Sequence, residues 1–181
     1  LKQHNKEKMM KILITILLSI SLNTMAMVGQ KAPEFDVSEW INGDAISIND
    51  LRGQVVVIDF FQLWCPGCNA FSIPLMHEWE DKYQQQIKDG KLKILSIHTV
   101  FEGHDVQTPA LLKVFLKIRD INHLVGNDRL APGKLTPETM ERYQTRGTPE
   151  VAIIDKDGII RMQEVGFFDV ATAEKLIDSL L

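Results

Sequence analysis

Cysteine and positive charge are both scarce in this sequence. It has two cysteines among 181 residues, Cys65 and Cys68, so it can close at most one internal disulfide and cannot offer four thiolates to a zinc ion. Acidic residues number 24 against 20 basic ones, and the formal net charge of −4 argues against nucleic acid as a partner. Internal repeats, low-complexity segments and a domain linker are also absent from the sequence, and its length is that of one domain.

A long apolar run is missing as well. The longest largely apolar stretch, residues 12–22, is shorter than the roughly 20 residues that a bilayer requires. Basic residues precede it, and small residues follow it at the positions that a signal peptidase inspects. We therefore expect residues 1–26 to be an export signal, with an uncleaved membrane anchor as the alternative and Met9 or Met10 as the true start. Residues 27–181 would then be a domain in the periplasm or another space outside the cytoplasm.

The two cysteines lie close together, after the apolar run Val55–Ile58 and before a helical pattern. Two thiols separated by two residues can close a small disulfide and reopen it. If Cys65 caps the helix and Pro66 takes its first position, the proline loses no hydrogen bond, and Gly67 keeps the surroundings of the sulfur open. The unpaired N–H groups and the dipole at the helix end favour the thiolate of Cys65. The sequence therefore predicts that Cys65 is the nucleophile and Cys68 the resolving thiol.

The stretch from Trp64 to Cys68, Trp-Cys-Pro-Gly-Cys, resembles the active site of the thioredoxin superfamily. In that superfamily a cis-proline after a small or β-branched residue faces the two cysteines and binds the substrate chain, and Thr148-Pro149 matches it. Cis peptide bonds are almost confined to proline, although a plain turn before a strand is the simpler interpretation of these two residues. The resemblance thus implies that substrate contacts come from Trp64, Pro66, Gly67, Thr148 and Pro149.

Within the superfamily the chain is similar to the extracytoplasmic TlpA-like and redoxin (AhpC/TSA-type) branch. The resemblance covers residues 28–168 and depends on four short stretches: Val28–Phe35, Leu51–Gly53, Ile97–Glu102 and Asp155–Gly158. There are departures from the usual pattern. Pro74 follows Cys68 one residue later than is typical, and Asn69 and Ser72 stand near the positions where a basic and an acidic residue are common.

The implied fold is α/β, a thioredoxin-like three-layer α/β/α sandwich with a mixed central sheet. The continuous apolar run Val55–Phe61 is typical of a strand buried on both faces, and alternating strands and helices favour a parallel central part. A helix from Pro66 to about Ile87 should be kinked by Pro74. The TlpA-like resemblance also implies an added N-terminal β-hairpin, formed by residues 35–37 and 45–47 around an Asn-Gly-Asp turn.

Asp59 interrupts the apolar run Val55–Phe61. A carboxylate inside such a strand costs free energy unless it is paired, and burial should keep it protonated more readily than a surface aspartate. In thioredoxins an aspartate at this position shuttles a proton to the resolving thiol, so the resemblance implies the same role for Asp59. A purely structural hydrogen bond is the alternative.

The resemblance implies a thiol-disulfide oxidoreductase that exchanges the Cys65–Cys68 pair with protein substrates and needs no metal or organic cofactor. As a reductase, it would attack a substrate disulfide with its thiolate and form a mixed disulfide, and its second thiol would then displace the product. The same steps in reverse would make it an oxidase. A reductase outside the cytoplasm needs a membrane or periplasmic thiol electron donor. We expect the protein to be a monomer.

A peroxidase of the peroxiredoxin type is one alternative function. Peroxiredoxins place a proline seven residues, and a threonine or serine three residues, before the reactive cysteine. Ile58 and Gln62 occupy those positions for Cys65, and Phe61 and Cys65 occupy them for Cys68. The peroxide pocket is therefore missing from the sequence.

The loop Thr99–Gln107 is a candidate for substrate binding. It follows a predicted core strand at the edge where open α/β sheets bind ligands, so His98, Phe101 and His104 could line a substrate groove, although a solvated loop is the simpler interpretation.

Copper(I) prefers soft thiolates, and a copper-binding module could combine the two cysteines with His98 or His104. A structural disulfide or a zinc half-site would explain less, because the loop is short and no third cysteine is present.

Overall fold

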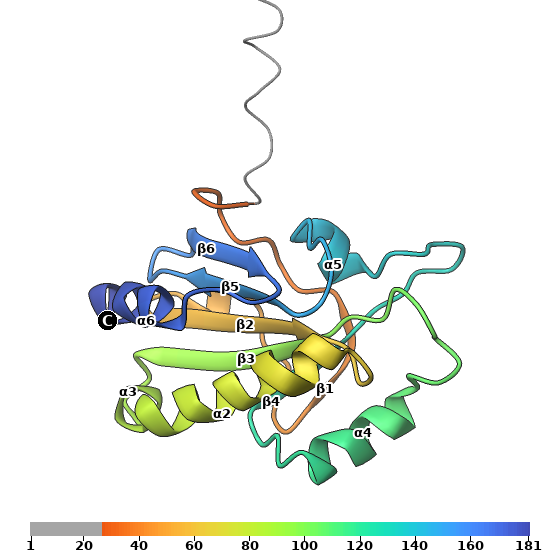
Figure 1. The fold of residues 1–181 in the computed structure, drawn as a ribbon. Coiled ribbons are helices and arrows are strands. Elements are labelled where there is room, and N and C mark those ends of the chain that lie inside the picture. Colours follow the sequence, from red (N-terminus) through yellow and green to blue (C-terminus); the bar gives the residue numbers. More distant parts are fainter. Residues whose placement is uncertain (1–26) are drawn as a thin grey trace, which may run out of the picture.

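The computed structural model describes residues 27–181, and six of its strands form one mixed sheet (Figure 1). The order across the sheet is β1-β4-β3-β2-β5-β6. Strands β2, β3 and β4 are parallel to one another, whereas β1, β5 and β6 run antiparallel to their neighbours. The strands are β1 (Val37–Ile41), β2 (Val55–Phe61), β3 (Leu92–His98), β4 (Leu124–Asp128), β5 (Glu150–Ile154) and β6 (Ile160–Val165). The predicted mixed sheet with a parallel centre is confirmed.

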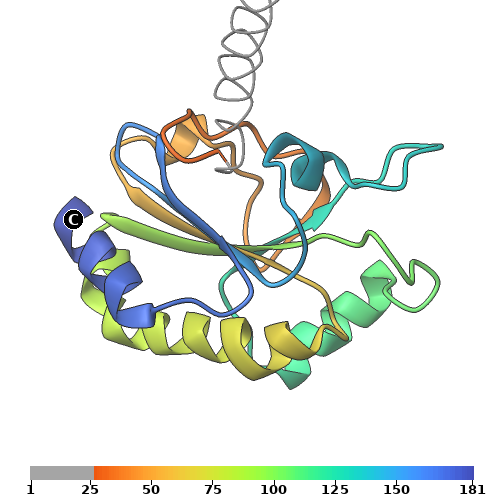
Figure 2. The ribbon, with the colours of Figure 1, turned by 45° about the horizontal axis from the view of Figure 1, so that its top comes forward.

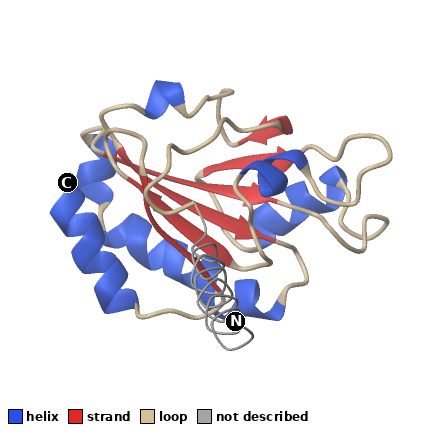
Figure 3. Ribbon diagram, turned by 90° about the horizontal axis from the view of Figure 1, so that it is seen from above, coloured by secondary structure: helices blue, strands red, loops and turns tan. Residues whose placement is uncertain are grey.

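Helices cover both faces of this sheet (Figure 2). One face carries α2 (Ile73–Lys82), α3 (Gln84–Lys88), α4 (Pro109–Ile118) and α6 (Val170–Leu180). The other face carries α5 (Glu138–Arg142), the 3-10 turn η1 (Asn49–Leu51) and the segment that leads into β1. The view from above shows the strands fanning out between these two layers (Figure 3). The predicted α/β/α sandwich is therefore present.

Strand β2 is buried along its whole length and divides the core between the two layers. Alternate side chains of a strand point to opposite faces. Val56, Ile58 and Phe60 pack with Tyr143 on the α5 side, whereas the side chains of Val55 and Val57 pack on the α2 and α6 side. By the same alternation, Asp59 points to the face that α2 covers.

The predicted N-terminal hairpin is wrong. Residues 37–41 do form a strand, but β1 pairs with β4 at the far edge of the sheet, and residues 44–47 form no strand. Asn42 shows why the chain takes this course, because its backbone has φ 67° and its side-chain amide donates to the carbonyls of Ile121 and His123 at 2.9 and 3.1 Å. The turn therefore attaches to the segment before β4 instead of closing a hairpin on itself.

The helix that follows the cysteines contains an unpredicted wide turn. Pro66 and Gly67 are helical, η2 (Cys68–Ser72) is a π-helical turn, and α2 then continues to Lys82 before a break at Tyr83. Pro74 cannot donate a hydrogen bond to the preceding turn, which favours the wider pattern there. The π-turn holds one residue more than an α-turn.

None of the helices in residues 27–181 has the length and apolar character needed to cross a membrane. The predicted export signal, residues 1–26, lies outside the described residues.

Candidate active site

Cys65 lies at the point where the chain leaves β2 and enters the helix. Its Sγ accepts a hydrogen bond from the backbone N–H of Cys68 at 3.2 Å, and its carbonyl accepts one from the N–H of Asn69 at 3.1 Å. Cys65 is thus the helix cap, with Pro66 at the first helical position, as the sequence predicts. Both cysteines are free thiols, Cys65 half-buried and Cys68 fully buried.

The bond between Thr148 and Pro149 is cis, as the resemblance implied, and it faces the cysteines. The Cys65 thiol donates to the Thr148 carbonyl at 3.3 Å. A Cβ atom at Gly67 would lie 2.8 Å from Cδ of Pro149, so only glycine fits there without a shift. The structure therefore brings together two segments that are 83 residues apart in the sequence.

Cys68 differs from Cys65 in its surroundings. It is fully buried among side chains that include Phe61, Ile73 and Leu112. Burial raises the pKa of the Cys68 thiol, and the neighbouring Cys65 and the negative charge of Asp59 raise it further. Cys68 is therefore protonated at neutral pH and cannot be reached by a large substrate.

Asp59 is 1% exposed, on the same side of the sheet as Cys68. Burial raises its pKa to about 7, while the nearby Ser72 hydroxyl offsets part of the rise. Within the described residues, neither carboxylate oxygen of Asp59 has a hydrogen-bond partner of normal geometry, and neither has the Ser72 hydroxyl. The alternative of a fully satisfied structural aspartate is therefore not what the geometry shows.

Trp64 stands beside Cys65 with its side chain 53% exposed. Its indole Nε1 donates to Oε1 of Gln62 at 3.2 Å. Gln62 also accepts a hydrogen bond from Gln107, at the end of the loop Thr99–Gln107. Sequence reasoning assigned no role to these two glutamines, since contacts across 45 residues leave no local pattern.

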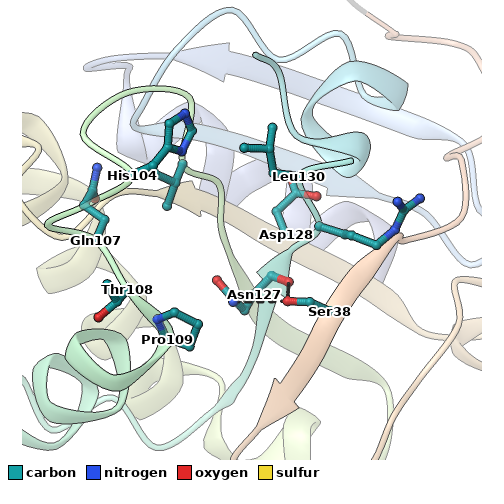
Figure 4. Close-up of a pocket in the computed structure, with 10 residues that line it drawn as sticks. Ser38, His104, Gln107, Thr108, Pro109, Asn127, Asp128 and Leu130 are labelled. Carbon is teal, nitrogen blue, oxygen red and sulfur yellow. Dashed lines mark hydrogen bonds between the residues drawn. The ribbon is translucent and has the colours of Figure 1, made fainter. Parts of the chain in front are cut away.

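The two histidines considered as ligands lie in different surroundings. His98 is fully buried, and its Nδ1 lies 3.1 Å from Oδ1 of Asn127; burial lowers the pKa of His98. His104 is exposed and lines a pocket of about 290 Å³ beneath the loop. Figure 4 shows His104 and Gln107 on one side of this pocket and Asp128 on the other. In residues 27–181 no three His, Cys, Asp or Glu side chains gather in a group that could hold a metal.

Two thiols of unequal exposure at a helix start, facing a cis-proline on a mixed sheet, define the thioredoxin-like class of thiol-disulfide oxidoreductases. A sequence model described as the AhpC/TSA family matches residues 28–163, and the chain belongs to this family.

Known proteins are similar to the chain along most of its length. Thiol-disulfide oxidoreductase ResA of Bacillus cereus is 27% identical over 139 residues, which cover 77% of this chain and 70% of ResA. The crystal structure of a thiol-disulfide isomerase from Corynebacterium glutamicum has 38% identity and a TM-score of 0.74, covering 83% of this chain and 96% of that one. Thioredoxin-like superfamily protein SPOA0173 has 39% identity and a TM-score of 0.75, covering 83% and 95%. The protein is a thiol-disulfide oxidoreductase, and its substrates are protein thiols and disulfides.

Proposed function

We propose that Cys65 is the nucleophile and Cys68 the resolving thiol of a disulfide exchange with protein substrates. The thiolate of Cys65 attacks a substrate disulfide, forms a mixed disulfide with one substrate sulfur and releases the other as a thiolate. Cys68 then loses its proton and attacks Sγ of Cys65, which closes the Cys65–Cys68 disulfide and releases the second substrate thiolate. The substrate gains two electrons and the pair loses two. Run in reverse, the same steps oxidise a substrate dithiol.

The contact geometry of Cys65 is the observation that carries this proposal. Its sulfur is the accessible one, it accepts the Cys68 N–H at 3.2 Å, and it lies 3.3 Å from the carbonyl of Thr148. A helix N–H aimed at the sulfur stabilises a thiolate, both as attacking group and as leaving group. Since Cys68 is buried, it can react only with the sulfur beside it.

Asp59 is proposed to take the proton of Cys68 when the mixed disulfide is resolved. A carboxyl group with a pKa of about 7 is present in both protonation states at neutral pH, which suits a group that accepts and returns a proton. Among the described residues, neither of its carboxylate oxygens has a hydrogen-bond partner of normal geometry. Asp59 acts on a group that is itself inaccessible to the substrate.

Five further residues are proposed to contact the substrate chain around Cys65. Trp64 offers an exposed apolar face, and Gly67 leaves room for Pro149 to approach. The backbone beside the cis bond, at Thr148 and Pro149, lies next to the reactive sulfur. Pro66 is the first helical residue after Cys65 and completes this set.

We propose that the protein works as a monomer outside the cytoplasm, in the periplasm or an equivalent compartment. The support is the basic, apolar and small-residue pattern of residues 1–26. Thiols in such a compartment stay reduced only if electrons are supplied, so a reductase of this kind requires a thiol donor at the membrane or in the periplasm.

A redox titration of the Cys65–Cys68 pair, with insulin reduction measured alongside it, tests the proposal. We expect Cys65→Ser to abolish insulin reduction and Cys68→Ser to accumulate a mixed disulfide with the substrate through Cys65. A low potential with reductase activity identifies an electron donor, and a high potential identifies an oxidant. Rapid peroxide consumption through a sulfenic acid at Cys65, or copper that survives a chelator, would contradict the proposal in favour of the two alternatives.

A further inference from the structure

Two buried glutamines join the loop Thr99–Gln107 to the segment that carries the cysteines. Gln62 is 1% exposed and Gln107 is 4% exposed. The Nε2 group of Gln107 donates to Oε1 of Gln62 at 2.6 Å, and Oε1 of Gln107 accepts the backbone N–H of Leu63 at 2.9 Å. One amide group thus fixes the end of the loop to two consecutive residues just before Trp64.

The same pair of amides determines what lies behind Trp64. Oε1 of Gln62 accepts the indole N–H of Trp64 at 3.2 Å, and Nε2 of Gln107 also donates to the carbonyl of Glu102 at 2.9 Å. The next residue, Gly103, has φ 61°, and a Cβ there would lie 2.1 Å from Cζ2 of Trp64. The loop backbone is therefore in direct contact with the indole ring.

Gln107 also borders an open pocket. Gln107 lines the pocket of about 290 Å³, with His104 on the same side and Asp128 across the opening (Figure 4). The amide hydrogen bonds of Gln107 therefore help to hold the loop against Trp64. Replacing Gln107 would leave its buried partners without their hydrogen bonds, which costs stability.

We propose that residues 99–107 form one wall of the substrate site, and that Gln107 is the positioning residue that gives the enzyme its preference for protein disulfides over small ones. This inference rests on the proposed function of Cys65. A protein chain that reaches Cys65 must pass the half-exposed indole of Trp64, so its binding depends on where the ring and the loop behind it are held. A small disulfide needs only the sulfur.

The test compares Gln107→Ala with Gln84→Ala, the same substitution at an exposed position on α3, outside the loop. Each variant is assayed for kcat and KM with insulin and with hydroxyethyl disulfide. We expect Gln107→Ala to lower the ratio of kcat/KM for insulin to kcat/KM for the small disulfide about tenfold, mainly by raising the KM for insulin. A change of this size is expected when a hydrogen-bonded contact is lost. Gln84→Ala should keep the wild-type ratio.

Fluorescence provides a readout that does not depend on activity. The emission of Trp64 is obtained as the difference between each protein and the same protein with Trp64→Phe. We expect Gln107→Ala to shift this emission and increase its quenching by acrylamide, because the loop no longer covers the ring. Gly103→Ala keeps both glutamines but forces the loop and Trp64 apart, so it should reproduce the loss of preference.

The outcomes separate the two proposals. An equal loss with both substrates would overturn the specificity role and leave Gln107 as a support of the thiol site. An unchanged ratio in spite of altered Trp64 emission would show that the loop is not part of the substrate site. A wild-type protein that reduces neither disulfide would instead refute the proposed function of Cys65.

Discussion

Replacing Asp59 with asparagine should make the reduced protein more stable, and by an amount that grows with pH. Burial raises the pKa of this carboxyl from 3.8 to about 7, which corresponds to about 4 kcal/mol. The folded state keeps its proton at pH values where the unfolded chain has already lost it. Wild-type stability therefore falls as pH rises from about 4 to about 7, whereas asparagine has no proton to lose.

Urea unfolding of both reduced proteins from pH 4 to pH 8.5 measures this difference. We expect the gain of Asp59→Asn over wild type to be smallest at pH 4 and to rise by up to about 1.4 kcal/mol per pH unit before levelling off above pH 7. Asp81→Asn, at an exposed position on α2, serves as the matched control and should follow the wild-type curve. Parallel curves for Asp59→Asn and wild type across this range would refute the assignment of a buried, proton-binding carboxyl.

Four further outcomes are expected. Asp59→Asn should slow insulin reduction at neutral pH without loss of fold, and an unchanged pH–rate profile would remove Asp59 from the mechanism. Gly67→Ala should lower stability by about 1–3 kcal/mol and impair turnover, because its Cβ would lie 2.8 Å from Cδ of Pro149; unfolding and insulin assays check this. Asn42→Ala should destabilise the fold by about 1–3 kcal/mol through two lost hydrogen bonds and a positive φ, with Asn42→Gly losing less. Arg129 lowers the pKa of Asp36, so Arg129→Ala should cost stability at neutral pH and progressively less below about pH 3.8, as acid unfolding would show.

The cysteine end of the site could be predicted because its physics is local. A cysteine cap, a proline at the first helical position and a following glycine are consecutive residues, and the structure places them as the sequence predicts. The cis bond before Pro149 also followed from a short stretch, although only the family resemblance connected it with the cysteines. Buried Asp59 was visible as the single charge in an apolar strand.

Predictions that depended on distant partners were wrong or absent. The sequence around Asn42 reads as a hairpin turn, but its side chain binds carbonyls 79 and 81 residues away and directs β1 to the far edge of the sheet. Gln62 and Gln107 act through a contact across 45 residues. No pattern of neighbouring residues encodes such pairings, since they arise only when the sheet brings the segments together.

The π-turn at Cys68–Ser72 decides how this segment can be exchanged with that of a relative. Each residue added to a helix rotates everything after it by about 100°. Consider a donor whose helix lacks the π-turn and is one residue shorter there. A chimera that took the donor sequence only as far as Cys68 would keep the wide turn of this chain and the packing of the helix after it. A graft that ended inside the turn would change the number of residues before Pro74 and swing the buried face of α2, including Leu75 and Trp79, away from the sheet. The boundary of any such transplant belongs before Cys68 or after Ser72.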